Sequence, residues 1–275
     1  MLYNPNESTI EGDMELKRQN TMHVIQEAIK RHKACTLMVY EEVPYLLKPF
    51  FDVGVRMFEV HAGSIYLGKD QLTKPGSPLQ LRIENMHIAR SILGDEAYIT
   101  MPGYGTFTST TPLPFTDEEA LALSQAGASG CHTHKWRWND LENLVKIAHR
   151  NGLVVDAYIS HSKDEYFYYG IPADTPQEVS QVAGKMEKIG VDMIGILTGM
   201  TYQGLQAGGM SPELRKRIDA LVNTTKVPTI IEGGITLENF KPFKETGAQI
   251  LVVYTAFKDM IIESMKNAAK QILEG

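Results

Sequence analysis

Eight short apolar runs recur along this chain, and amphipathic segments separate them. This alternation indicates repeated βα units and a parallel sheet whose strands are buried on both faces. Only an open doubly wound sheet or a closed barrel buries so many parallel strands in this way. The predicted strands are residues 35–40, 56–61, 97–101, 130–134, 153–160, 193–198, 229–232 and 250–254.

Glycines stand just before most of these runs, where a helix that ends in a left-handed residue needs one. They are Gly54, Gly94, Gly127, Gly152, Gly190 and Gly247. Helix starts are predicted after Thr116 and Thr175, each followed by a glutamate at capping-box spacing, and at Ser211, which precedes a proline.

No G-x-G-x-x-G turn follows any predicted strand, which favours the closed barrel over the doubly wound sheet. We therefore predict an α/β fold, a (β/α)8 TIM barrel formed as a single domain by residues 34–275. An N-terminal extension and helix, residues 1–33, precede it. The helix is expected over roughly residues 14–32, where it either closes the lower face of the barrel or joins an oligomer.

Composition narrows the function classes. The 275 residues suit one barrel with an extra helix, and no window approaches the roughly 18 consecutive apolar residues of a membrane span. The start of the chain lacks the pattern of a secretion signal, so we expect a cytoplasmic protein without a membrane partner. A net charge of −6 without long runs of one sign argues against nucleic acid as a partner. We also expect a homo-oligomer, a dimer.

The two cysteines, Cys35 and Cys131, fall inside predicted strands and have no C-x-x-C spacing. Buried thiols are therefore expected rather than a disulfide scaffold or a zinc knuckle.

The end of the chain has the pattern of a phosphate-binding site. A predicted strand runs into Gly233-Gly234, and the last strand runs through Tyr254 into Thr255. The last two units of such barrels often hold phosphate, because glycines let the backbone approach the ligand and helix-opening N–H groups attract an anion. We predict a small phosphorylated substrate held by these four residues. Strands followed by two glycines also occur without a ligand, so that alternative stays open.

Polar residues gather at the carboxyl ends of the predicted strands, where barrel enzymes build their active sites. Alternation places Glu59 with His61 on one face, and His132 with His134 on one face. Imidazole and carboxylate groups bind divalent cations, so Glu59, His61 and His132 are predicted metal ligands. Mg²⁺ is the first expectation, with Zn²⁺ or Mn²⁺ as alternatives. A histidine at a strand end can instead be a hydrogen-bonded structural residue, and the cluster fails if the opposite face points inward.

Several segments resemble the ribulose-phosphate-binding barrels, and among them the group of 3-hexulose-6-phosphate synthase and 3-keto-gulonate-6-phosphate decarboxylase. Residues 58–64 resemble the strand of that group that carries a magnesium-binding glutamate, and residues 190–203 resemble its sixth strand and following loop. Gly233-Gly234 is similar to its phosphate-binding turn. The resemblance runs from about residue 35 to residue 257.

This resemblance implies a metal-assisted carbon–carbon lyase or aldolase that acts on a sugar phosphate through an enediolate. The predicted catalytic residues are Glu59, His132, His134 and Asp156, and the residues predicted to bind substrate or phosphate are Thr198, Gly199, Gln203, Gly233, Gly234, Tyr254 and Thr255. Among the catalytic residues the resemblance suggests Glu59, while the two histidines have no counterpart in that group and are predicted from their place at a strand end. A divalent ion held near Glu59 would polarise the carbonyl group, and His132 or His134 would carry the proton.

The chain departs from that group in two places. Residues 97–105 contain neither lysine nor carboxylate where the group has a D-x-K-x-x-D motif, and Tyr254 stands where it has a phosphate-binding glycine. Two alternatives therefore remain beside the lyase. One is a metal-dependent sugar-phosphate epimerase or isomerase, and the other is a non-catalytic barrel that binds a phosphorylated metabolite.

Overall fold

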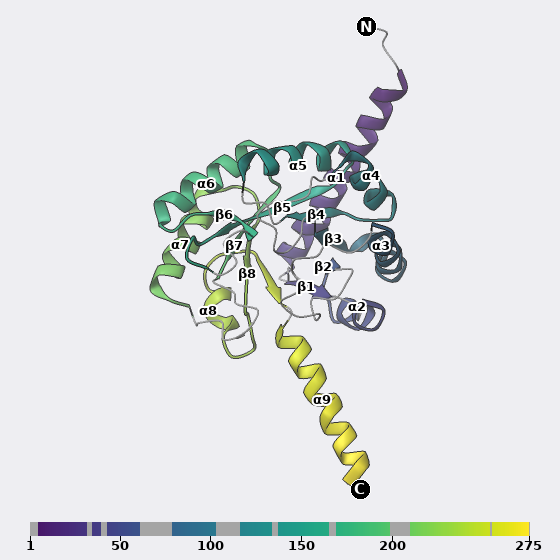
Figure 1. Cartoon of the computed structure of the whole chain (residues 1–275), viewed down its shortest axis with the longest axis vertical. Helices are drawn as coiled ribbons and strands as arrows, with labels where there is room; N and C mark the ends of the chain where they lie inside the picture. Colours follow the sequence, from purple (N-terminus) through teal and green to yellow (C-terminus); the bar gives the residue numbers. More distant parts are fainter. Residues whose placement is uncertain are drawn as a thin grey trace.

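The barrel is closed by eight parallel strands (Figure 1). The computed structural model describes residues 5–31, 35–39, 43–60, 79–102, 116–133, 137–164, 169–198, 210–253 and 255–274. Within these residues the ring consists of β1 (Cys35–Val39), β2 (Met57–Val60), β3 (Tyr98–Pro102), β4 (Gly130–Thr133), β5 (Val154–Ser160), β7 (Met193–Leu197), β8 (Thr229–Glu232) and β9 (Ile250–Val253). Each strand pairs with the next, and β9 pairs with β1 to close the ring. The predicted α/β barrel is confirmed.

Helices follow the strands and lie outside the ring (Figure 1). They are α2 (Val43–Asp52), α3 (Leu79–Leu93), α4 (Asp117–Gln125), α5 (Trp138–Arg150), α6 (Pro176–Lys188), α7 (Pro212–Thr224), α8 (Phe240–Lys244) and α9 (Thr255–Glu274), with a 3₁₀ turn, η3 (Gly94–Glu96), before β3. A two-residue strand, β6 (Ile171–Pro172), pairs with the end of β5.

The local signals at the helix ends are confirmed. Thr116 accepts a hydrogen bond from the backbone N–H of Glu119, Thr175 forms a full capping box with Glu178, and Ser211 caps α7. All six glycines expected at helix ends have positive φ, from 64° at Gly94 to 106° at Gly127. Cys131 is buried, as expected, whereas the side chain of Cys35 lies outside the described part of the chain.

Alternation along the strands separates two apolar layers. Side chains such as Phe58, Ile99 and Ile194 face outward and pack under the helices. Met57, Tyr98, Val154, Met193, Ile230 and Ile250 fill the interior together with Ile25 from α1 (Pro5–Lys30). Helix α1 thus closes the base of the barrel, the first of the two expected roles. It begins at Pro5, well before the expected start near residue 14, because Pro5 is tolerated in a first helical turn, where its missing N–H has no intrahelical partner.

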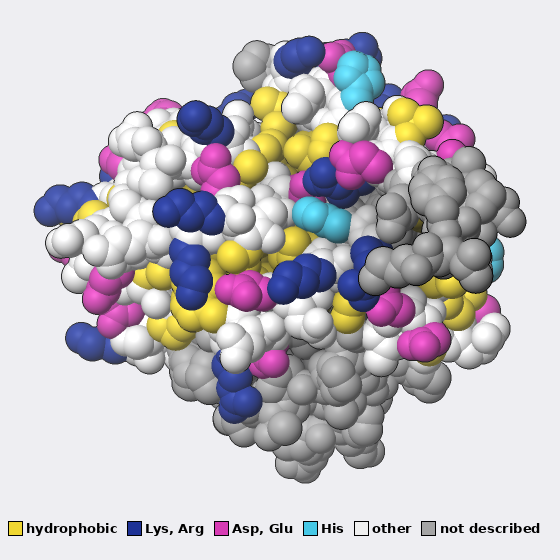
Figure 2. Space-filling view, turned by 90° about the horizontal axis from the view of Figure 1, so that it is seen from above, with side chains coloured by type: hydrophobic (Ala, Val, Ile, Leu, Met, Phe, Trp, Pro, Cys, Tyr) yellow, Lys and Arg dark blue, Asp and Glu magenta, His cyan; other side chains and the backbone are white. Residues whose placement is uncertain are grey.

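Two features of the surface are helix α9 and the distribution of charged side chains. In Figure 1, α9 extends away from the ring, and it exposes Met265, Ile272 and Leu273. On the face seen in Figure 2, acidic and basic side chains of the described residues are interspersed. No helix in the described ranges is both long enough and apolar enough for a bilayer crossing. The dimer stays a prediction.

The buried carboxylate of Asp192 anchors α1. Oδ1 accepts a hydrogen bond from Arg18 Nη1 at 2.6 Å, while Oδ2 accepts from the backbone N–H of Val155 at 2.8 Å and lies 2.9 Å from His149 Nε2. One side chain therefore joins α1, α5 and the start of β5.

We expect Asp192→Ala to lower the free energy of unfolding by about 2–4 kcal/mol, because it leaves a buried backbone donor and a partly buried guanidinium without their acceptor. Urea denaturation measures the loss. Asp219→Ala is the control, since it removes a half-exposed ion pair with Arg215 that should contribute below about 1 kcal/mol. Equal effects of the two substitutions would contradict the anchoring role.

Candidate active site

Four ionisable side chains meet inside the upper part of the barrel. Glu59, His132, Asp156 and Glu232 come from β2, β4, β5 and β8, and each is at most 3% exposed. His132 Nδ1 lies 2.6 Å from Asp156 Oδ2, and His132 Nε2 lies 3.6 Å from Glu59 Oε1. The structure therefore brings three of the predicted catalytic residues together around His132, and it adds Glu232.

Two tyrosines complete this cluster. The Tyr98 hydroxyl donates to Asp156 Oδ1 at 3.3 Å, and the Tyr158 hydroxyl hydrogen-bonds the carboxylate of Glu232. The Tyr158 ring also packs against the His132 ring, with centroids 4.8 Å apart. The tyrosines thus hold two carboxylates of the cluster, Asp156, which contacts His132 Nδ1, and Glu232.

Glycines on the neighbouring strands make room for both rings. A Cβ added to Gly130 would lie 2.4 Å from the Tyr98 hydroxyl oxygen, and one added to Gly195 would lie 2.3 Å from the Tyr158 ring. Gly195 is also the residue paired with Tyr158 between β5 and β7. The interior at this level therefore holds two large rings only because two strands present no side chain there.

The carboxylates around His132 keep its imidazole charged. Burial lowers the pKa of His132, but Glu59, Asp156 and Glu232 outweigh this effect, so the pKa rises from 6.5 to about 10. The side chain is therefore an imidazolium at neutral pH, and Asp156 fixes the orientation of its ring.

For Glu232, burial is the largest influence on the pKa. Burial raises the pKa of its carboxyl group, as do Glu59 and Asp156, while His132 and the Tyr158 hydrogen bond oppose the rise, and the net result is a pKa of about 7 instead of 4.5. Its Oε2 atom has no hydrogen-bond partner among the described residues. Glu232 therefore changes protonation near neutral pH and has an oxygen directed at no protein donor within that part of the chain.

The Gly233-Gly234 turn follows Glu232 directly. Gly233 has φ 123° and Gly234 has φ 55°, which are backbone conformations that favour glycine. Thr198 Oγ1 donates to Gly233 O at 2.7 Å, and Asn239 Nδ2 donates to Gly234 O at 2.9 Å. The predicted phosphate turn is thus held from both sides at the same end of the barrel as the cluster. Thr198 acts on this turn, and its contact with substrate stays a prediction.

Several other predicted site residues fall in parts of the chain that the structure does not describe. His61, His134, Gly199, Gln203 and Tyr254 lie outside the described residues. Thr255 begins α9, but its side chain is not among those described.

The predicted metal site has two of its three ligands side by side. Glu59 and His132 face each other, and Asp156 holds the other imidazole nitrogen in the manner of an outer-shell carboxylate. Within the described ranges, no three or more His, Cys, Asp or Glu side chains are grouped to hold a metal ion. The metal stays a prediction, and its ligation would require the imidazolium to lose its proton.

We expect a divalent ion to bind at near stoichiometry and to release a proton from His132 as it does so. Elemental analysis by mass spectrometry, together with a pH indicator during titration of Mg²⁺, Zn²⁺ or Mn²⁺, measures both quantities. Glu59→Gln should reduce the metal content, and Glu213→Gln, a change on the exposed face of α7, should not. A metal-free protein that takes up no added ion would contradict this prediction.

No role was predicted from the sequence for Glu232 or Tyr98. The available signal was parity, since Tyr98 is two residues before Thr100 and so shares its face of β3.

Comparison with known proteins gives the fold. No protein-family model matches the chain, and its sequence matches no curated protein. Among solved structures, 2,3-dimethylmalate lyase, a PEP mutase/isocitrate lyase superfamily member, is 14% identical with a TM-score of 0.60, over 92% of this chain and 87% of that one. The chain is an α/β barrel.

Two other structures support the same conclusion. A tryptophan synthase alpha-subunit from Pyrococcus furiosus is 8% identical with a TM-score of 0.59, over 84% of this chain and 91% of that one. Thiamine phosphate pyrophosphorylase from the same organism is 17% identical with a TM-score of 0.50, over 82% and 88%. Identities this low show the fold alone, so the resemblance to the hexulose-phosphate synthase group stays a prediction.

Proposed function

We propose that this protein is a carbon–carbon lyase that cleaves a small sugar phosphate through an enediolate. The observation that supports it best is the buried cluster of Glu59, His132, Asp156 and Glu232, in which the carboxylates raise the pKa of His132 and burial raises that of Glu232. The Gly233-Gly234 turn beside Glu232 provides a place for the phosphate. Barrels of similar fold include 2,3-dimethylmalate lyase and thiamine phosphate pyrophosphorylase, which is consistent with this class.

The residues divide the chemistry between them. The Glu232 carboxylate takes the proton of the hydroxyl group on the carbon that will leave as an aldehyde. The adjacent carbon–carbon bond breaks, and its electron pair moves onto the carbonyl oxygen of the remaining fragment to give the enediolate. The positive charge of His132 stabilises that oxygen, and Glu232 returns the proton to carbon. A divalent ion on the predicted ligands Glu59, His61 and His132 would displace the proton of His132 and would itself supply the positive charge that polarises the carbonyl.

An isomerase or epimerase is the second candidate. It would use the same enediolate, with Glu232 moving a proton between neighbouring carbons and no bond between carbons broken. The neutral-range pKa of Glu232 favours such a proton transfer equally. A non-catalytic barrel that binds a phosphorylated metabolite is the third candidate, supported by the missing D-x-K-x-x-D motif.

Incubation with a panel of ketose phosphates in D₂O, followed by NMR, distinguishes the three. The lyase predicts an aldehyde product together with deuterium in the remaining fragment, and Glu232→Gln should abolish both while Glu213→Gln retains them. Deuterium in recovered sugar phosphate without cleavage would replace the lyase with the isomerase. Tight binding without exchange or cleavage would leave the non-catalytic barrel.

The phosphate turn is tested by a pair of substitutions that differ in charge. Gly234 has φ 55°, which asparagine and aspartate tolerate better than other side chains. We expect Gly234→Asp to raise KM for the phosphorylated substrate about tenfold or more above that of Gly234→Asn, because like charges repel at a helix-turn anion site. The two variants should not differ towards the unphosphorylated sugar. Equal KM values for the phosphorylated substrate would contradict phosphate binding at this turn.

A further inference from the structure

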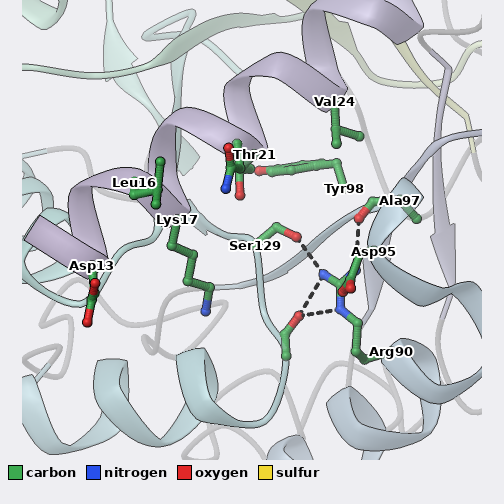
Figure 3. Close-up of a pocket in the computed structure, with 12 residues that line it drawn as sticks. Asp13, Leu16, Lys17, Thr21, Val24, Arg90, Asp95, Ala97, Tyr98 and Ser129 are labelled. Atoms are coloured by element: carbon green, nitrogen blue, oxygen red, sulfur yellow. Dashed lines mark hydrogen bonds between the residues drawn. The ribbon is translucent and has the colours of Figure 1, made fainter.

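A pocket opens at the base of the barrel, at the opposite end from the His132 cluster. It has a volume of about 450 Å³ and lies between α1 and the segments that enter β3 and β4 (Figure 3). Lys17 and Thr21 line it from α1, and Arg90, Tyr98 and Ser129 line it from the other side. Its size is that of a small-molecule site.

The two cations of this pocket are held by neutral acceptors. Arg90 Nε and Nη2 both donate to Gly127 O, at 2.9 and 2.7 Å, and Nη2 also donates to Ser129 Oγ at 2.7 Å. Lys17 Nζ donates to the backbone oxygen of Ser124 at 2.8 Å and to its hydroxyl at 2.6 Å. Within the described part of the chain, neither cation forms an ion pair with a carboxylate.

This arrangement leaves the ammonium group of Lys17 without a carboxylate partner among the described residues in a partly buried place, while the charge of Asp95 acts on Arg90. Two acidic residues, Asp13 and Asp95, also border the pocket, but both are exposed to solvent. Burial, followed by the charge of Arg90, lowers the pKa of Lys17 from 10.5 to about 8. An anion beside Lys17 would restore the favourable charged state, and an ammonium group with two hydrogen bonds made has a third N–H to donate.

Apolar surface accompanies the charge. Leu16, Val24 and the ring of Tyr98 line the same pocket, so a ligand that fits it has an apolar body as well as a charged group. We propose that this pocket is a binding site for a small organic anion, whose charged group contacts Lys17 and whose apolar part packs on Tyr98. The site is separate from the proposed active site and does not rest on the lyase.

Tyr98 gives the site a regulatory position. Its ring lines the pocket, while its hydroxyl donates to Asp156, which holds His132. A ligand in the pocket therefore touches a side chain that reaches the catalytic cluster from below.

Phenyl phosphate is a suitable probe because it combines a dianion with an apolar ring. Calorimetry at pH 8 in two buffers of different ionisation enthalpy should show one-to-one binding with uptake of about 0.5 proton, since a group with pKa near 8 is half protonated there. Lys17→Met should weaken binding at least tenfold and remove the proton uptake, whereas Lys188→Met, an exposed change on α6, should alter neither.

A second variant guards against loss of structure. Lys17→Arg keeps the charge but does not titrate, so it should bind phenyl phosphate without proton uptake. Absence of binding to the unaltered protein at millimolar concentrations would overturn the proposal. Binding and proton uptake that survive in Lys17→Met would overturn it as well, because the ligand would then occupy another place, such as the Gly233-Gly234 turn.

Discussion

Replacing His132 with glutamine is expected to lower kcat by about 10²–10⁴-fold and to destabilise the protein by about 3–5 kcal/mol at neutral pH. Glutamine can hydrogen-bond Asp156 but carries no charge. Glu59, Asp156 and Glu232 would then remain buried without the imidazolium that balances them. Replacing a residue that only acts on substrate would lower kcat without this loss of stability, so the two measurements together distinguish the two roles.

The pH dependence of that destabilisation has a definite sign. The folded-state pKa of His132, about 10, lies above its ordinary value of 6.5, so the stabilisation by its charge is fully present below 6.5 and is lost as the pH rises through 10. The difference between the two proteins should therefore be largest between about pH 4 and pH 6.5 and shrink as the pH rises towards 10. It should also shrink below about pH 4, where the carboxyl groups become neutral.

Urea denaturation between pH 4 and pH 10 measures this profile, and a coupled assay measures kcat. His87→Gln is the matched control, because His87 is an exposed histidine on α3 and should alter neither quantity. A difference that stays constant across the pH range would contradict the charged state of His132.

In the unaltered protein, Glu232 adds a second step, at lower pH, to the dependence of the free energy of unfolding on pH. Its folded-state pKa, about 7, also lies above its ordinary 4.5, so its contribution is present below 4.5 and is lost as the pH rises through 7. Glu232→Gln should remove this step and leave the step due to His132.

Gly195→Ala is expected to destabilise the protein by about 1–3 kcal/mol or more through overpacking, although it adds a single methyl group. The added Cβ would lie 2.3 Å from Cε1 and 2.4 Å from Cδ1 of Tyr158, a ring that is 1% exposed. The ring cannot move without disturbing its contact with His132 and its hydrogen bond to Glu232. Activity should therefore fall with stability.

Gly184→Ala provides the control for the chemical change alone. Gly184 lies within α6, and a Cβ added there meets nothing within 4 Å, so alanine should stabilise the helix by about 0.5–1 kcal/mol. Tyr158→Leu combined with Gly195→Ala tests the cause, because a smaller side chain should relieve the clash and the two effects should not add. Additive effects would show that Gly195 matters for another reason.

The strands were predictable because their signals are local. β8 spans Thr229–Glu232 as expected, since an apolar run, a preceding proline and a following pair of glycines define it. β2 and β5 begin one residue later than the predicted runs, at Met57 and Val154, because hydrogen-bonded pairing and the sequence pattern need not start at the same residue.

The site was predictable only in part. Parity placed Glu59 with His61, and His132 with His134, on one face of each strand, but it did not decide which face points inward. The fit of Tyr158 against Gly195 depends on which strands are neighbours and at what register. Likewise, no local pattern shows that the Tyr98 hydroxyl ends beside Asp156, 58 residues later in the chain. Such contacts follow from the closure of the ring and the shape of its interior.

The closing helix of the barrel also bears on how the chain is made. Lys17 and Arg18 contact Ser124 and Asp192, which follow them by 107 and 174 residues. At translation rates of about 5–20 residues per second, Arg18 is synthesised about 9–35 s before Asp192. Until the strands have followed, the apolar residues of α1, Ile25 among them, have no barrel interior to enter. The base is thus completed by a segment that is made before every strand of the ring that it closes.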